Sequence, residues 1–180
     1  MTRVLGIDCG SNATGYGLIE TDGRASSMIV SGVIRTRRQS SFADRLCRIA
    51  QALRELIEIY APAEVAIESI FHSVNARSAL QLGHVRGVAL LIAAEAQLPI
   101  HEYSPLQIKS SVVGYGRAEK MQVQEMVKLL LRLDSKPPED AADALAAALC
   151  HAHHSRTLTK LSRSVSRTPA RAARSLATQA

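Results

Sequence analysis

The pattern of hydrophobic and polar positions divides the chain into strand-like and helix-like segments. Three apolar runs joined by short turn-forming links, over residues 3–9, 14–21 and 27–35, predict strands that form an antiparallel meander. Apolar residues at spacings of three and four then predict an amphipathic helix from Phe42 to Tyr60. The chain is therefore expected to begin with a three-stranded sheet followed by one helix.

The rest of the chain alternates between strand and helix patterns. A fourth strand is predicted over residues 64–69 and a short fifth strand over 99–104, with a helix over 75–97 between them. Further helical segments are predicted over residues 105–112, 119–133 and 139–153. This order predicts an α/β domain with a mixed five-stranded sheet, its first three strands antiparallel, flanked by helices.

Two glycines, Gly83 and Gly87, lie four residues apart on one face of the predicted helix over 75–97. Glycine has no side chain to hold a neighbour away, so another backbone can approach closely there. That neighbour could be the chain's own sheet or a second copy of the chain. The sequence leaves both interpretations open.

Composition adds limits to this picture. The chain has 180 residues, of which 47% are hydrophobic and only 3% aromatic, so its core is expected to be aliphatic. It contains no apolar run of membrane-spanning length and no signal-peptide pattern, which favours a soluble, cytoplasmic protein with no membrane partner. Cys9, Cys47 and Cys150 are widely spaced and are expected to be reduced thiols.

The net charge of +6 is concentrated at one end of the chain. Six basic residues and no acidic residue lie in residues 155–180, which leaves 16 basic and 16 acidic residues in 1–154. The end segment is also poor in large apolar residues, so we expect a folded domain over 1–154 and a basic, disordered tail over 155–180. This tail could add salt-sensitive affinity for DNA, or it could serve only solubility.

Four carboxylates stand where predicted elements begin or end, in otherwise apolar or small-residue stretches. They are Asp8, Glu68, Asp140 and Asp143. Side chains alternate across a strand, so Asp8 shares a face with Gly6, and Glu68 shares one with Ala66. Small neighbours would let the alanine-rich helix that begins EDAADALAAAL lie close over both strand ends. We therefore expect the four acids to converge.

Converging carboxylates repel each other unless some are protonated or bind a cation. An all-oxygen ligand set selects Mg²⁺ or Mn²⁺ over zinc, and such a set can hold two ions that act together on a phosphodiester. Each acid also has a simpler explanation by itself. Asp140 and Asp143 suit the start of a helix, and Asp8 could begin a turn. The joint occurrence of all four favours a metal site.

Several segments together resemble a known family. LGIDCGSNATGYGLIE, AIESIF, NARSALQLGHVRG, VVGYGRAEK and DAADALA, in this order, resemble the RuvC-type Holliday-junction resolvases over roughly residues 3 to 154. The resemblance implies an RNase H-like nuclease domain, a homodimer, and Mg²⁺-dependent cutting of two strands of like polarity at a four-way DNA junction. It also implies a branch-migration complex of the RuvA and RuvB kind as partner.

The resemblance assigns roles to individual residues. The four acids match the family's metal-binding carboxylates, with Cys9 standing where the family usually has proline. Phe71 matches an aromatic residue that engages junction bases, and Lys109 and Lys120 match basic residues near the scissile phosphate. Without the family, Phe71 could equally be a core residue, and the two lysines could be ordinary solvated charges.

Other basic residues are weaker candidates for DNA contacts. Arg77, Arg86 and Arg117 are plausible contacts to the DNA backbone, although each could be a solvated surface charge. A second basic patch is formed by Arg35, Arg37 and Arg38. The expected enzyme would use two Mg²⁺ per site, would leave 5′-phosphate and 3′-hydroxyl ends, and would place its two sites on one face of the dimer.

Three other functions compete with this interpretation. The stretch DCGSNATG also resembles the phosphate loop of actin-like ATPases and sugar kinases, but those enzymes need two domains, for which 180 residues are too few. A non-catalytic DNA-binding relative would not need all four acids. A smaller RNase H-like nuclease would lack Phe71 and the VVGYGRAEK segment. The full set of features favours the resolvase.

Histidines gather near the end of the predicted helix over 139–153. Cys150 and His154 stand four residues apart, and His151 and His153 lie beside them, which raises the question of zinc. No second pair of ligands accompanies them. We therefore interpret these histidines as side chains that favour the end of a helix.

Overall fold

A five-stranded sheet divides the protein into two helical layers. The computed structural model describes residues 1–37, 39–69 and 76–165, with side chains described as far as residue 155. The elements along the chain are β1 (Thr2–Asp8), β2 (Ala13–Thr21), β3 (Ser26–Arg35), α1 (Phe42–Tyr60), β4 (Glu64–Glu68), α2 (Ala76–Glu95), β5 (Ile100–Tyr103), α3 (Pro105–Val113), α4 (Lys120–Leu130) and α5 (Glu139–Val165).

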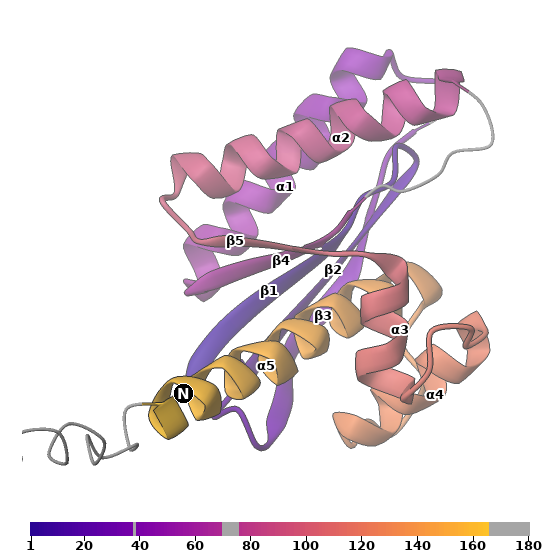
Figure 1. Ribbon diagram of the computed structural model, residues 1–180. Coiled ribbons are helices and arrows are strands. Elements are labelled where there is room, and N and C mark those ends of the chain that lie inside the picture. The colour runs from indigo at the N-terminus through magenta and orange to yellow at the C-terminus, as the bar shows by residue number, and fades with distance from the viewer. Residues whose placement is uncertain (38, 70–75, 166–180) are drawn as a thin grey trace, which may run out of the picture.

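The strands lie in the order β3-β2-β1-β4-β5. β1, β2 and β3 pair antiparallel, while β4 runs parallel to β1 and β5 runs parallel to β4. The predicted mixed sheet with three antiparallel strands is therefore confirmed. Helices α1 and α2 cover one face, and α5 with α3 and α4 covers the other (Figure 1).

Side-chain alternation along the strands builds two separate cores. Leu5 and Ile7 of β1 face the α1–α2 layer, where they pack with Leu18, Ile49 and other aliphatic residues. Val4 of β1 faces α5, whose alanines are almost completely buried against the sheet. The two layers thus differ in character. Large aliphatic side chains fill the first, whereas the second combines the alanines of α5 with larger residues such as Leu145 and Leu149.

Local sequence signals set where the helices start. The Ser41 hydroxyl accepts a hydrogen bond from the backbone N–H of Asp44 and caps α1. Ser104 and Gln107 form a reciprocal capping box at the start of α3, where Pro105 occupies the first turn. Residues 137–138, both proline, precede α5, which begins at Glu139 as the sequence predicts.

The last helix is longer than the sequence predicts. α5 continues to Val165, so residues 155–165 extend the helix into the segment for which we expected disorder, and residues 166–180 lie outside the described part of the chain. The physical reason is cooperativity, since an already formed helix gains one backbone hydrogen bond for each further residue at little cost. Among helices of the described residues, none combines the length and apolar character needed to span a bilayer.

The glycines of α2 face outward. A Cβ atom added at Gly83 or Gly87 would meet no atom within 4 Å, so these positions do not pack on the chain's own sheet. The interpretation that the glycines pack on the chain's own sheet is therefore wrong. A contact with a second copy of the chain stays a prediction.

Strand β1 and helix α5 lie very close together at Gly6. A Cβ atom at Gly6 would lie 1.9 Å from the carbonyl oxygen of Ala144, a backbone atom that moves only if the helix moves. We expect Gly6→Ala to lower the free energy of unfolding by at least about 2 kcal/mol, within the range for overpacking a core. Chemical denaturation at fixed protein concentration measures the change.

The control is Ser27→Ala on the exposed part of β3, which should change the free energy of unfolding by less than about 0.5 kcal/mol. Equal stabilities of Gly6→Ala and Ser27→Ala would contradict the close packing of α5 on β1.

Candidate active site

Three of the predicted acids meet in one pocket. Asp8 ends β1 and Glu68 ends β4, and because these strands are parallel neighbours their ends lie at the same edge of the sheet. Asp143 reaches the same place from the second turn of α5. The pocket is lined by Asp8, Glu68, Asp143, Lys109, Lys120, Pro105, Ile108 and Val123.

Two glycines allow α5 to come close enough for this meeting. Gly6 lies against the backbone of Ala144, as described above, and a Cβ atom at Gly15 of β2 would lie 1.9 Å from the carbonyl oxygen of Asp140. The sequence pattern indicates the small residue beside Asp8 on β1 but gives no sign of the part that Gly15 plays. The pairing of Asp8 with Gly15 across the β1–β2 hairpin explains why β2 must also be small at this point.

Asp140 occupies a slightly different place from the other acids. It is half-buried beside Gly15 and does not line the pocket itself. Its negative charge nevertheless raises the pKa values of Asp8 and Asp143. The four acids therefore form one electrostatic group, three of them within the pocket and one at its border.

The pocket strongly disfavours negative charge on its own carboxylates. Burial first, and then the charges of the other three acids, raise the pKa of Asp8 to about 8. Burial also raises the pKa of Glu68, with the charge of Asp143 as the next cause. For Asp143 burial again raises the pKa, and the ammonium group of Lys120 opposes it. A cation bound among these oxygens would relieve the repulsion, so the donor set fits a hard divalent metal.

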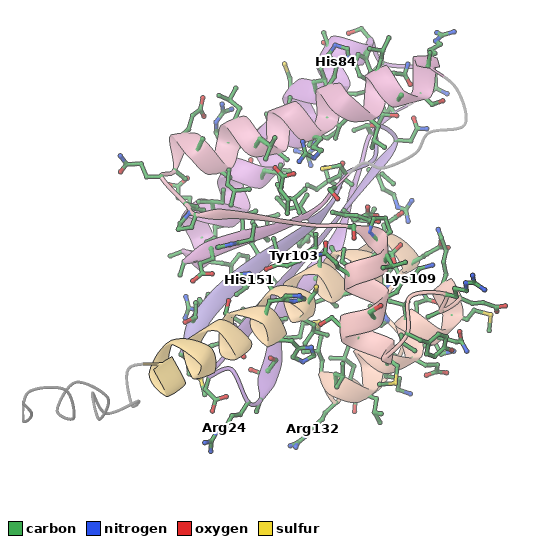
Figure 2. The ribbon with its side chains drawn as sticks, in the orientation of Figure 1. Arg24, His84, Tyr103, Lys109, Arg132 and His151 are labelled. Carbon is green, nitrogen blue, oxygen red and sulfur yellow. The ribbon has the colours of Figure 1, made fainter. Side chains whose placement is uncertain are left out.

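Two lysines from separate helices face the acids. Lys109 of α3 and Lys120, the first residue of α4, both line the pocket (Figure 2 labels Lys109). Both lower the pKa of Glu68, which shows that their positive charges act on the site. Lys120 forms an ion pair with Glu139 on the first turn of α5, and this hydrogen bond is the main cause of its own raised pKa. Lys120 is thus held between the two helices at the border of the pocket.

The remaining predicted contacts are more scattered. Arg77, in the first turn of α2, and Arg117, in the turn before α4, are both exposed. Arg86 forms an ion pair with Glu102 of β5. Phe71 lies outside the described residues.

The second basic patch is larger than the sequence indicates. Arg35 and Arg37 line a hollow together with Arg45 and Arg48 of α1. Arg38 lies outside the described residues. The helical pattern over Phe42 to Tyr60 gives no sign that Arg45 and Arg48 would meet the end of β3.

Cys9 occupies the position at which the RuvC-type resolvases usually have proline. Its side chain packs against the core on the α1–α2 side of the sheet. Burial raises the pKa of the Cys9 thiol to about 12, so the thiol stays protonated and behaves as a small apolar group.

Comparison with known proteins decides the family. Residues 4–151 match the family model described as crossover junction endodeoxyribonuclease RuvC. The chain belongs to the RuvC family. RuvC of Halorhodospira halophila is 54% identical over 154 residues, which span 86% of this chain and 92% of that relative. RuvC of Koribacter versatilis is 52% identical over 161 residues, spanning 88% of this chain and 97% of that relative.

A solved RuvC structure confirms the fold. The structure of Thermus thermophilus RuvC in complex with Holliday junction substrate matches with a TM-score of 0.84 and 34% sequence identity. The match covers 88% of this chain and 98% of that chain. The RNase H-like fold and the RuvC resemblance inferred from the sequence are both confirmed.

The raised pKa of Asp8 gives this RuvC chain an unusual dependence of stability on pH. Between the ordinary value of 3.8 and about 8 the folded state binds a proton at Asp8 that the unfolded state has released. Stability of the metal-free protein should therefore fall as pH rises across this window. We expect Asp8→Asn to be stabilising, and its gain to increase from pH 5 to pH 8 by at least about 1.4 kcal/mol, the equivalent of one pKa unit.

Asp22→Asn is the contrasting control, measured in the same denaturation series. Backbone hydrogen bonds from Ala25 and Arg24 lower the pKa of Asp22, so its contribution is present at neutral pH and is lost in acid. This variant should be destabilising at neutral pH only. A constant effect of Asp8→Asn from pH 5 to pH 8 would contradict the raised pKa.

Proposed function

We propose that this chain resolves four-way DNA junctions by paired, symmetric nicks in strands of like polarity. The observation that carries the proposal is the meeting of Asp8, Glu68 and Asp143 in one pocket, with Asp140 at its border, in a member of the RuvC family. The Thermus thermophilus relative was solved with a Holliday junction substrate, which supports the same class of substrate here. Homologous recombination and DNA repair are the processes that produce such junctions.

The four carboxylates would hold two Mg²⁺ ions, for which Mn²⁺ could substitute. Their repulsion and their all-oxygen chemistry support this choice. When bound, such ions supply an activated water and stabilise the leaving oxygen of a phosphodiester. The expected products carry 5′-phosphate and 3′-hydroxyl ends.

The protein's own groups position the DNA strand. Lys109 and Lys120 stand opposite the acids, where their ammonium groups can bind a phosphate and offset the negative charge that develops on it. The glycine turn between α3 and α4, with Gly114 at a positive φ of 96°, lets the two lysine-bearing helices meet at one pocket. We assign the exposed Arg77 and Arg117 to contacts with the DNA backbone. By the family resemblance, Phe71 is assigned to stacking on an unpaired base.

The exposed face of α2 supports a homodimer. Leu80 and Leu91 expose 64% and 55% of their surface, and Gly83 and Gly87 lie between them on the same side of the helix. An apolar stripe with a glycine groove suits close packing against the same helix of a second copy. Such a contact relates the two copies by a two-fold axis, and the two copies would supply the two cuts that a symmetric junction requires. RuvA and RuvB are the proposed branch-migration partners, by membership of the family.

The function is tested with a labelled, mobile four-way junction and a linear duplex of the same sequence, each with Mg²⁺ or EDTA. Wild type should nick the junction symmetrically in Mg²⁺ alone. Asp8→Asn should cut at least about 100-fold more slowly, because several kcal/mol of metal-derived transition-state stabilisation is lost. Asp134→Asn, at an exposed acid away from the pocket, is the matched control and should retain activity.

Two results would refute parts of this proposal separately. Equal cutting of linear duplex would exclude junction selectivity. Undiminished cutting by Asp8→Asn would exclude the assignment of the metal site.

The dimer is tested by Gly87→Arg, followed by sedimentation equilibrium. A side chain at this position meets no atom of its own chain, so the monomer should fold normally. A charged side chain in the apolar stripe should weaken dimerisation at least about 30-fold, the factor for a 2 kcal/mol hot spot. Leu129→Arg is the control, at a leucine that is 68% exposed on α4, across the sheet from α2. Equal dimerisation of both variants would rule out α2 as the interface.

A further inference from the structure

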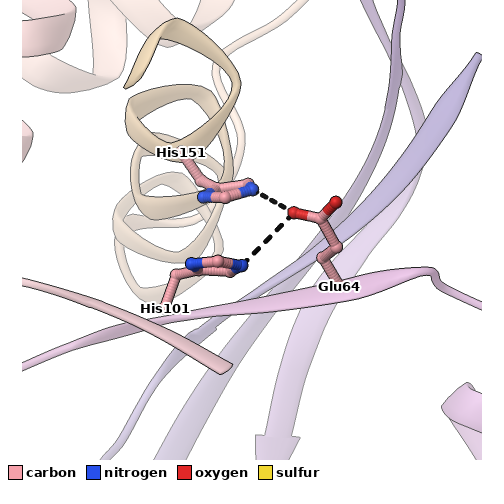
Figure 3. Close-up of side chains that lie close together, drawn as sticks. All are labelled: Glu64, His101 and His151. Carbon is pink, nitrogen blue, oxygen red and sulfur yellow. Dashed lines mark hydrogen bonds and ion pairs between the residues drawn. The ribbon is translucent and has the colours of Figure 1, made fainter. Parts of the chain in front are cut away.

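A second group of metal-binding side chains lies away from the four acids. Glu64 begins β4, His101 lies on β5 and His151 lies on α5 (Figure 3). Oε2 of Glu64 is 3.4 Å from Nε2 of His101 and forms a hydrogen bond with Nε2 of His151. These three ligand atoms all lie within 4.8 Å of one another. We call this group the Glu64–His101–His151 cluster.

The path of α5 along the sheet explains why the cluster forms. Glu64 and Glu68 share one face of β4 and are separated by about 13 Å of strand. Asp143 and His151 share one side of α5 and are separated by about 12 Å of helix. Helix α5 runs antiparallel to β4, and these two lengths agree. Glu68 and Asp143 therefore meet at one end of β4, and Glu64 and His151 meet at the other end. The second meeting point follows from the same packing that builds the active site.

Both histidine rings present Nε2 to Glu64. The rings of His101 and His151 stack with centroids 4.1 Å apart and planes 26° apart, and both Nε2 atoms point toward Glu64 (Figure 3). Nδ1 of His151 lies 2.7 Å from the hydroxyl of Tyr103. A histidine ligand typically uses its second nitrogen in such a hydrogen bond, which fixes the ring and its tautomer.

Tyr103 can form a hydrogen bond with Nδ1 of His151 both with and without a metal. In the metal-free protein the His151 Nε2–H donates to Glu64, and Nδ1 accepts a hydrogen bond from the tyrosine hydroxyl. With an ion on Nε2, the proton moves to Nδ1, which then donates to the same hydroxyl. Burial raises the pKa of Tyr103 to about 12, so the hydroxyl remains protonated and can play either part.

We propose that Glu64, His101 and His151 form a second metal site, which takes Zn²⁺ or a similar transition metal rather than Mg²⁺. Two imidazole nitrogens and one carboxylate are a common zinc ligand set, whereas the four acids offer only oxygen. Ligands at zinc distances on a tetrahedral ion lie about 3.3 Å apart, close to the observed separation of Glu64 and His101. The ion would replace the hydrogen bond between Glu64 and His151 and leave one position for water.

The surroundings suit the binding of an ion from solvent. His151 is only 4% exposed, but the side chains of Glu64 and His101 are 29% and 38% exposed, which opens one side of the cluster. Burial, followed by the nearby His101, lowers the pKa of His151. An ion here would join α5 to β4 and β5. It would thereby stabilise α5 and β4, which also carry active-site acids.

The test is a titration of the metal-free, full-length protein with Co²⁺, in excess Mg²⁺ that occupies the oxygen ligands of the active site. Wild type should bind one Co²⁺ per chain, with visible absorption typical of low coordination number, and Zn²⁺ should displace it. His101→Ala and Glu64→Gln should each bind Co²⁺ more than about 100-fold more weakly. Loss of a group that only hydrogen-bonds to a metal ligand already lowers metal affinity by about 10- to 100-fold. Zn²⁺ should raise the melting temperature of wild type and leave that of Glu64→Gln unchanged.

His84→Ala is the matched control, because His84 is an exposed histidine on α2 outside the cluster. It should bind Co²⁺ as wild type does. Glu64→Gln keeps the size of the side chain, so it separates loss of a ligand from loss of folding, which circular dichroism checks. The proposal is overturned if His101→Ala binds Co²⁺ as tightly as wild type, or if wild type binds none in excess Mg²⁺.

Discussion

The contact on which the structure depends is the close passage of α5 over β1 and β2. Gly6 and Gly15 lie directly under the carbonyl groups of Ala144 and Asp140, where any larger residue would overlap the helix backbone. This passage brings the first turns of α5 to the strand ends that carry Asp8 and Glu68. The same contact that completes the alanine-rich core therefore places the carboxylates together, and their mutual repulsion creates the demand for a cation.

The active site and the fold are connected through stability as well as geometry. Burying several carboxylates in one pocket costs stability, as the raised pKa of Asp8 indicates. Close packing of the two cores must offset this cost in the metal-free protein. Lys109 and Lys120 reduce the repulsion only in part, because Lys120 also pairs with Glu139. The pocket is thus arranged to bind positive charge brought by an ion.

Much of this arrangement could be predicted from short-range sequence patterns. Strand parity placed Asp8 beside Gly6, and helix spacing placed Asp140 and Asp143 together. Other features depend on distant segments and could not be found in this way. Gly15 matters only because the hairpin pairs it with Asp8, and Glu64, His101 and His151 meet only when strand order and helix direction are known. In the sequence, His151 stands beside Cys150, His153 and His154, none of which belongs to the cluster.

We infer that packing of α5 on the sheet gathers the four carboxylates into one metal site. The most direct measurement is anomalous scattering from crystals of the protein grown in Mn²⁺. We expect strong anomalous peaks bounded by Asp8, Glu68, Asp140 and Asp143, at the shared ends of β1 and β4. Saturating Mn²⁺ that leaves no peak among these acids, or a peak ligated by acids from only one element, would contradict it.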